Sequence, residues 1–168
     1  MHLSVALWTL LASFSVVYAC SITTGVKVTF YGSPDNDPAG SIAVAHDCGG
    51  RNYEAGGIGT YADPVTFASA GGEYQVCETI YSPYLKKYLR REDDCASCDA
   101  KQIDVFTGSA VDGGDKQIEC ENILTPEATQ GVIRSPAEDL DVDETALFDS
   151  GTCNTKHVYV DNDPEDYC

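Results

Sequence analysis

The sequence has few basic residues: Lys and Arg number 10 against 27 Asp and Glu, and the formal net charge at pH 7 is −17. Nucleic acids and anionic membranes attract proteins through clustered positive charge, so this balance argues against both as partners. The chain also has one tryptophan, Trp8, and no Asn-X-Ser/Thr glycosylation site. It has no Gly-X-Ser-X-Gly motif and no phosphate-binding glycine loop, so neither a serine-hydrolase elbow nor nucleotide binding is indicated.

Long apolar runs are scarce. One spans residues 3–17, and no second run of that length follows. This run is shorter than the roughly 20 residues that cross a bilayer, and Val17-Tyr18-Ala19 suits cleavage by signal peptidase. We expect a signal peptide over residues 1–19 and one secreted, extracellular domain over residues 20–168, without a membrane anchor. A buried N-terminal helix is the alternative for the same run.

All eight cysteines lie in the expected mature chain. An even number of cysteines in an exported protein indicates four disulfides, each adding roughly 2–4 kcal/mol to stability. The sequence leaves their pairing open. The expected disulfide cysteines are Cys20, Cys48, Cys77, Cys95, Cys98, Cys120, Cys153 and Cys168.

Cys95 and Cys98 form a Cys-X-X-Cys motif. A redox site of the thioredoxin type needs positive surroundings that lower a thiol pKa, whereas acidic residues flank this motif on both sides. A zinc ribbon needs a second such motif, and the chain has none. We therefore interpret the pair as a structural disulfide. Beyond the leader the chain keeps two histidines, His46 and His157, and we expect neither a metal nor another cofactor.

Short segments rich in β-branched and aromatic residues recur along the chain and are separated by Gly and Pro. The alternating run at residues 26–31 is the clearest of them. The expected strands cover residues 26–31, 41–45, 65–68, 78–82, 84–89, 102–107, 117–124 and 157–160. Strands of this length and spacing predict an all-β barrel or sandwich.

One helix is indicated near the C-terminal end. Ser135-Pro136-Ala137-Glu138 matches a capping box with proline at the first helical position. The helix would run to about Phe148, although its apolar pattern is sparse. An acidic surface loop is the alternative for this segment.

Four of the ten basic residues, Lys86, Lys87, Arg90 and Arg91, lie close together. On a strand they would form a docking site for an anionic partner. The alternative is a solvent-exposed face that the three acidic residues after Arg91 partly neutralise, and we prefer this second interpretation.

A series of segments in a fixed order carries a more specific signal. The segments are Thr29-Phe30-Tyr31-Gly32, residues 48–53, 59–68 and 80–88, Asp93-Asp94-Cys95, and residues 102–108. In this order they resemble the double-psi β-barrel group, which includes expansins, barwin-like proteins, family 45 endoglucanases and bacterial lytic transglycosylases. The resemblance is strongest to small secreted fungal proteins of that type. It implies a six-stranded double-psi β-barrel over about residues 26–124, stabilised by disulfides, with an acidic C-terminal extension over residues 125–168.

The resemblance implies a central role for Asp104, which lies between Ile103 and Val105. In that group an Asp in such a context faces the polysaccharide groove. Burial between apolar neighbours would raise its pKa and suit it to protonate a glycosidic oxygen. A purely structural hydrogen bond to the backbone is the alternative for Asp104. The expected site residues are the catalytic Asp104 and Asp94 and the substrate-binding Tyr31, Tyr61 and Tyr81.

The chain departs from the hydrolases at the second carboxylate, which an inverting enzyme needs as a base. The hydrolase family places it directly after the first-strand aromatic residue, where this chain has Gly32 and Ser33. Asp35 or Asp37 in the following turn would have to replace it. We therefore predict a secreted, expansin-like protein that binds or modifies cell-wall polysaccharide. The alternative is a non-catalytic module that binds an extracellular protein, as an effector or a protease inhibitor.

Overall fold

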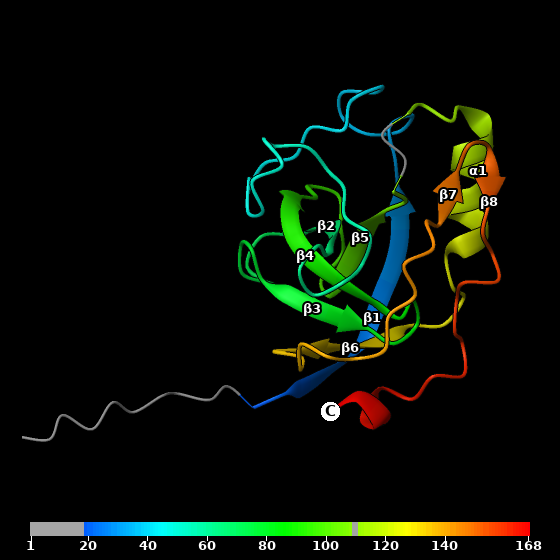
Figure 1. The fold of residues 1–168 in the computed structure, drawn as a ribbon. Coiled ribbons are helices and arrows are strands. Elements are labelled where there is room, and N and C mark those ends of the chain that lie inside the picture. Colours follow the sequence, from blue (N-terminus) through cyan, green and yellow to red (C-terminus); the bar gives the residue numbers. More distant parts are fainter. Residues whose placement is uncertain (1–18, 109–110) are drawn as a thin grey trace, which may run out of the picture.

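The computed structural model describes residues 19–108 and 111–168 (Figure 1). The expected signal peptide, residues 1–19, lies outside this part except for Ala19. Within the described residues, no helix has both the length and the apolar character that crossing a membrane requires.

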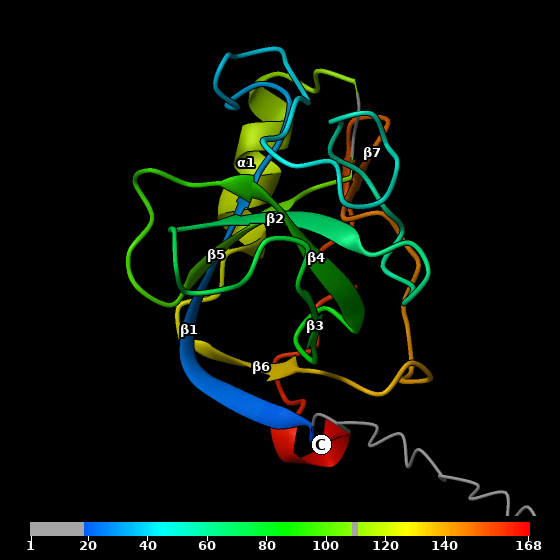
Figure 2. The same cartoon turned by 90° about the vertical axis from the view of Figure 1, so that its left-hand side faces the viewer.

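Six strands close into a barrel around a hydrophobic core (Figures 1 and 2). They are β1 (Ser21–Tyr31), β2 (Val65–Ser69), β3 (Thr79–Ser82), β4 (Lys87–Asp94), β5 (Gln102–Phe106) and β6 (Gln130–Arg134). The order around the barrel is β1-β5-β2-β4-β3-β6, with β1/β5 and β2/β4 parallel and the other pairs antiparallel. The predicted fold class is confirmed as a mostly β protein with a closed six-stranded barrel and four disulfides.

The alternation of side chains along β5 separates the core from the outer face of the barrel. Ile103 and Val105 are 0% exposed and fill the interior. Asp104, between them, therefore points to the opposite face of the sheet. The parallel register places it beside Thr29 of β1, and the antiparallel register places it beside Ala68 of β2.

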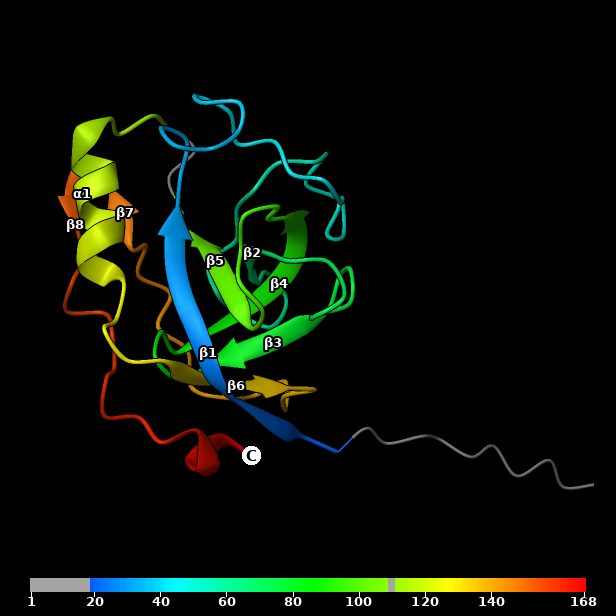
Figure 3. The same ribbon diagram turned by 180° about the vertical axis from the view of Figure 1, so that it is seen from behind.

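One α-helix, α1 (Asp115–Leu124), packs against β1 (Figures 1 and 3). Its buried residues follow a helical spacing and are Gln117, Cys120, Glu121 and Leu124. The prediction of a strand over residues 117–124 is wrong, because two of these four buried residues are polar and conceal the helical period. A disulfide to Cys153 joins the helix to β8 (Thr152–Cys153), which pairs with β7 (Phe148–Asp149).

The segment 135–147 contains no helix, so the predicted helix over residues 135–148 is wrong and the loop alternative is correct. Hydrogen bonds to barrel tyrosines take the place of helical ones. The Tyr88 hydroxyl donates to the Ala137 carbonyl and accepts from the Leu140 N–H at 2.9 Å. The Tyr81 hydroxyl donates to the Asp141 carbonyl at 2.5 Å. The segment is therefore held in an extended path across β3 and β4.

Three further strand predictions need correction. Residues 41–45 form one isolated bridge, between Ala43 and Glu54, and residues 157–160 form no strand. The strand predicted over residues 84–89 begins at Lys87, because the turn after β3 extends to Lys86, where φ is 49°. Strand β6 was not predicted, since its five residues include Gln, Gly and Arg and show no clear apolar pattern.

The eight cysteines form four disulfides, as predicted. The pairs are Cys20–Cys168, Cys48–Cys77, Cys95–Cys98 and Cys120–Cys153. The first joins the residue before β1 to the residue after the short 3-10 helix η1 (Pro164–Tyr167), so it connects the two ends of the described chain. The Cys-X-X-Cys motif is a disulfide in itself, in agreement with its structural interpretation.

Candidate functional site

An open groove of about 460 Å³ lies on the outer face of the barrel, where β1, β2, β4 and β5 meet the loops that follow β1 and β4. Its lining residues are Tyr31, Asp35, Asn36, Asp37, Ala68, Asp93, Asp94, Cys95, Ala96, Ser97 and Asp104. Five of them are aspartates and none is basic. The groove thus combines one tyrosine with a concentrated negative charge.

Asp104 lies at this groove and is not sealed in the core. Its Oδ1 accepts a hydrogen bond from the Thr29 hydroxyl at 2.6 Å, and Gln102 Nε2 donates to the Thr29 oxygen at 3.0 Å. Burial raises the pKa of Asp104, the Thr29 hydrogen bond opposes this rise, and the charges of Asp35 and Asp93 add to it. A carboxyl with a raised pKa at the wall of an open groove is suited to donate a proton.

A β-bulge in β4 brings two more carboxylates to the groove. The register of β2 with β4 shifts after the pair Phe67–Arg91, so that Glu92 is left out of the pairing and Ala68 faces Asp93. Bulges commonly redirect side chains beside active sites. Asp93 Oδ1 accepts hydrogen bonds from the N–H groups of Ala45 and Asp94, at 3.0 and 2.9 Å, while burial raises the pKa of Asp93.

Asp94, which the sequence predicts as an assisting residue, lies at the same groove. It forms an ion pair with Arg91 at 2.6 Å and contacts His46 Nε2 at 3.3 Å. Because a cation already pairs with its carboxylate, Asp94 is better suited to contact a ligand than to transfer a proton.

Tyr31 is the predicted sugar-binding tyrosine that the structure places at the groove. The residue is 6% exposed, and its hydroxyl has no hydrogen-bond partner within the described part of the chain. Burial, together with the charges of Asp93 and Asp104, raises its pKa well above the ordinary value, so the hydroxyl keeps its proton. Among the described residues, it is thus a buried hydrogen-bond donor without an acceptor, in a side chain that lines the groove.

The other two predicted tyrosines lie outside the groove. Tyr81 is 0% exposed and packs against Tyr88 in a separate cluster, with ring centroids 5.1 Å apart. Tyr61 contacts the same Tyr88 ring edge-on at 5.2 Å and is 38% exposed. Tyr81 and Tyr61 were predicted as site residues from the segments that carry the family resemblance. The sequence does not show that both rings contact Tyr88.

A hydrogen-bonded carboxyl pair that the sequence did not indicate joins the lining of the groove to the buried face of α1. Glu121 of α1 is 3% exposed and hydrogen-bonds to Asp35, whose Oδ1 accepts from the Gly32 N–H at 2.9 Å. Burial first, and then the charge of Asp35, raise the pKa of Glu121 to about 8. A Cβ at Gly32 would lie 1.9 Å from Gln117 Nε2, so the packing of α1 leaves no room for a side chain at Gly32. This is the position where the resemblance to family 45 endoglucanases would place the catalytic base.

We expect Glu121→Gln to alter how stability depends on pH. The folded protein binds a proton at Glu121 with a pKa of about 8, against 4.5 as the ordinary value. Between these pH values the folded state holds more protons than the unfolded chain, so this group makes the wild-type free energy of unfolding fall as pH rises. Urea unfolding from pH about 4.5 to pH about 8 should show a steeper decline for wild type than for Glu121→Gln. Parallel profiles for the two proteins would contradict the assignment.

The basic cluster at residues 86–91 is neither a docking site nor a solvent-exposed face. Lys87 is 1% exposed, and its Nζ donates to the carbonyls of Ile58 and Asp143. Arg90 and Arg91 are mostly buried and form ion pairs with Glu92 and Asp94. The preferred interpretation of a solvated face is therefore wrong, because Lys87, Arg90 and Arg91 are mostly buried and bind carbonyl oxygens or carboxylates.

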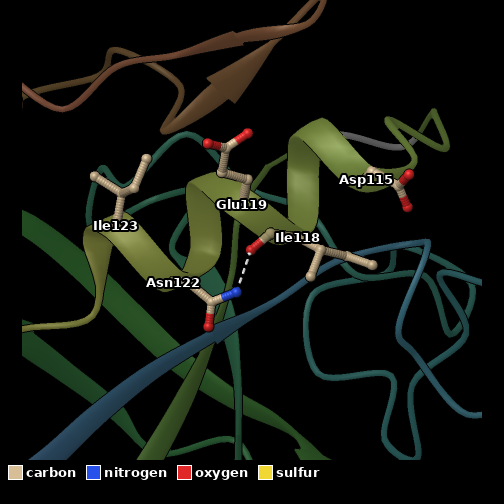
Figure 4. Close-up of a pocket in the computed structure, with 5 residues that line it drawn as sticks. All are labelled: Asp115, Ile118, Glu119, Asn122 and Ile123. Atoms are coloured by element: carbon tan, nitrogen blue, oxygen red, sulfur yellow. Dashed lines mark hydrogen bonds between the residues drawn. The ribbon is translucent and has the colours of Figure 1, made fainter.

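A separate hollow lies on the outer face of α1 (Figure 4). It is lined by Asp115, Ile118, Glu119, Asn122 and Ile123, all from one helix. Figure 4 shows the carboxylates of Asp115 and Glu119 pointing in different directions, while Asn122 Nδ2 donates to the Ile118 carbonyl of its own helix at 2.8 Å. The described side chains of this hollow therefore do not gather around a common point where a ligand could be bound. In the part of the chain that the structure describes, no group of three or more His, Cys, Asp or Glu residues is placed to hold a metal ion.

The fold and the groove define a class of protein: a disulfide-bonded, six-stranded β-barrel with an aspartate-lined groove on its outer face. Residues 23–154 match the model of the DDB_G0273701 N-terminal domain family, and the chain belongs to this family. It is 34% identical over 135 residues to the uncharacterized protein DDB_G0273701/DDB_G0273221 of Dictyostelium discoideum. That match covers 75% of this chain and 57% of the relative, so the chain spans little more than half of the relative's length. No solved structure matches the chain. The resemblance to expansins and barwin-like proteins stays a prediction.

Proposed function

We propose that this protein is secreted and binds or modifies a cell-wall polysaccharide in the groove around Asp104. One observation carries the proposal: Asp104, held by Thr29 at 2.6 Å, lines an open groove while burial raises its pKa. A carboxyl with a raised pKa keeps its proton in a larger fraction of molecules and can donate it to a glycosidic oxygen. Tyr31, with its unpaired hydroxyl, would hydrogen-bond a sugar hydroxyl beside Asp104.

If the protein cleaves its polymer, Asp104 is the general acid. Its proton passes to the glycosidic oxygen as the bond between that oxygen and the sugar carbon breaks. Inverting cleavage also needs a base, roughly 6.5–9.5 Å from the acid, that accepts a proton from the attacking water. Gly32 has no carboxylate to act as this base, and we assign the role to Asp35, which lines the groove. The Gly32 N–H donates a hydrogen bond to Asp35 Oδ1 and fixes its position. Binding without cleavage would use the same groove.

Secretion is supported by two features. The four disulfides would persist in an oxidising compartment and are rare in cytosolic proteins. The apolar run at residues 3–17 and the cleavage sequence after it have the form of an export signal. An N-terminal sequence beginning at Cys20 in protein recovered from culture medium would establish the processing.

The proposal is tested with Asp104→Asn on a panel of glucans, chitin, pectin and peptidoglycan. Binding is measured by sedimentation with each insoluble polymer, and cleavage by the release of soluble sugars. We expect wild type to bind at least one polymer, and any release to fall about 10²-fold in Asp104→Asn, because a positioned general acid contributes about that factor. The matched control is Asp99→Asn, since Asp99 is 75% exposed and pairs with Lys27 outside the groove.

The outcomes separate the parts of the proposal. Reduced release or binding in Asp104→Asn, with Asp99→Asn unchanged, supports the role of Asp104. Equal behaviour of wild type and Asp104→Asn on every polymer would remove Asp104 from the function. Circular dichroism on both variants confirms that the fold is retained.

A second function, binding of an extracellular protein, is favoured by a different observation. The loop between β1 and β2 exposes three large apolar side chains, Tyr53 at 55%, Ile58 at 47% and Tyr61 at 38%. Exposed aromatic and aliphatic residues of this kind are typical of protein-binding surfaces. A variant with Tyr53 and Ile58 replaced by serine would lose protein binding but keep polysaccharide binding if the two functions use separate surfaces.

A further inference from the structure

The charge of the groove limits which ligands can enter it. Its lining includes Asp35, Asp37, Asp93, Asp94 and Asp104, and no lysine or arginine among the described residues lines it. Clefts lined by charge of one sign raise the local concentration of ligands of the opposite sign and repel those of the same sign. The wider protein adds to this effect, because its formal net charge is −17. A polymer rich in carboxylates or phosphates is therefore a poor ligand for this groove.

The nearby cations neutralise only part of this charge: His46 contacts Asp94 at 3.3 Å, and the charge of Lys27 acts to lower the pKa of Asp104. Arg91 pairs with Asp94 at 2.6 Å, and Lys27 pairs with Asp99 outside the groove. Arg51 and Arg90 both pair with the buried Glu92 instead of a groove carboxylate. Asp37 lies in an exposed turn at the rim of the groove. A ligand that brings its own positive charge would complement the aspartates that remain.

An independent observation indicates that the ligand also carries an oxygen that accepts a hydrogen bond. Tyr31 is 6% exposed, lines the groove, and has a hydroxyl without a hydrogen-bond partner among the described residues. A buried hydroxyl without a partner is unfavourable, and a ligand oxygen that accepts its hydrogen bond relieves this. The ligand is thus expected to present ammonium groups to the aspartates and an oxygen acceptor to Tyr31.

We propose that the groove binds a polysaccharide of amino sugars with free, protonated amines, of the chemical class of deacetylated chitin. Each sugar unit of such a polymer carries an ammonium group and several hydroxyls side by side, and so matches both the aspartates and Tyr31. A basic peptide also offers ammonium groups and backbone carbonyl oxygens, but it lacks the rigid ring that holds an amine and hydroxyls side by side, and tetralysine therefore serves as the competing probe. This inference rests on the proposed function and assigns the substrate class of the same site.

The test is isothermal titration calorimetry at pH about 6, where carboxylates with ordinary pKa values are charged. The probes are a glucosamine tetramer, an N-acetylglucosamine tetramer, a galacturonic acid tetramer and tetralysine. We expect the glucosamine tetramer to bind about 10-fold more tightly than the N-acetylated tetramer, and the galacturonic acid tetramer not to bind. Tetralysine should bind about 10-fold more weakly than the glucosamine tetramer.

Three variants localise the binding. Asp37→Asn should weaken binding of the glucosamine tetramer about 3-fold, and Tyr31→Phe should weaken it by a similar factor. The exposed Asp161, outside the groove, supplies the control Asp161→Asn, which should bind as wild type does. Urea unfolding shows whether Tyr31→Phe is folded, and Asp37→Asn keeps the test valid if it is not.

Several results would overturn the inference. Equal affinity for the glucosamine and N-acetylglucosamine tetramers, lost in Asp104→Asn, would reject the amine requirement but leave the proposed function in place. Absence of binding to every saccharide would reject both. Equal affinity for tetralysine and the glucosamine tetramer would reject the assignment of a sugar ligand. Unchanged binding of the glucosamine tetramer to a folded Tyr31→Phe would reject it too. Unchanged binding in Asp37→Asn would reject the groove as the amine site.

Discussion

Replacing both Cys20 and Cys168 with serine is expected to lower the free energy of unfolding by about 5 kcal/mol. This disulfide closes a loop with a sequence separation of 148, so it restricts the unfolded chain more than any other pair in the protein. In the folded state it holds η1 against β6, and Tyr167 of η1 contacts Tyr81 of β3 with ring centroids 5.2 Å apart. Urea unfolding of the double variant under non-reducing conditions measures the effect.

The control for this prediction is the double variant Cys95→Ser with Cys98→Ser. That pair has a sequence separation of 3, and the same entropic relation predicts a loss of only about 1.5 kcal/mol. A loss of equal size in the two double variants would contradict the argument from loop length. It would mean that local contacts, and not restriction of the unfolded chain, determine the contribution of each disulfide.

Glu92→Gln is expected to lower the free energy of unfolding by about 3–5 kcal/mol, because it breaks a buried ion network. The Glu92 side chain is 2% exposed and accepts from Arg51 and from the Thr66 hydroxyl, the latter at 2.6 Å. Arg90 Nη2 lies 2.9 Å from its other oxygen. The neutral amide would leave the largely buried Arg90 guanidinium without its counter-charge, and Arg51 would keep only its pair with the more exposed Asp63.

The matched control is Glu54→Gln, which makes the same change at an exposed position. Exposed substitutions of this kind usually alter stability by less than about 0.5 kcal/mol. Equal urea midpoints for Glu92→Gln and wild type would contradict the assigned role of the network. Because Glu92 lies at the bulge that directs Asp93 to the groove, we also expect Glu92→Gln to weaken saccharide binding.

The barrel could be predicted from the sequence where strands alternate between apolar and polar residues. Residues 26–31, 65–68 and 102–107 were predicted as strands and lie almost entirely within β1, β2 and β5. Strand β4 was harder to place, because its basic and acidic residues have the composition of a surface. Arg90 pairs with Glu92 of the same strand, and the buried Glu92 also pairs with Arg51 of a distant segment, which the sequence pattern does not show.

Helix α1 was missed for a related reason. Gln117 and Glu121 are buried and polar, and they bond to Thr107 and Asp35 of other segments. A hydrophobic period cannot reveal a helix whose inner face is half polar. The helix predicted after Ser135 was wrong for a different reason. Its capping pattern is a local signal, whereas the tyrosine hydroxyls that hold the segment extended come from distant strands.

The site was predicted in part. The resemblance to the double-psi β-barrel group pointed to Asp104, Asp94 and Tyr31, and the structure places these three residues at one groove. Asp93 reaches the same groove through a bulge, and Glu121 of α1 hydrogen-bonds to Asp35 of its lining. The residue pattern predicts neither the position of a bulge nor the packing of a helix. The sequence therefore could not place Asp93 and Glu121 at the site.

The central claim, that the groove around Asp104 holds the saccharide, is tested most directly by nuclear magnetic resonance. Uniformly ¹⁵N-labelled protein is titrated with the oligosaccharide that binds best, and the amide shifts are mapped onto the fold. We predict saturable shifts that centre on Tyr31, Asp37, Asp94 and Asp104. Shifts confined to the exposed loop around Tyr53, or no saturable shift with any saccharide, would contradict the account.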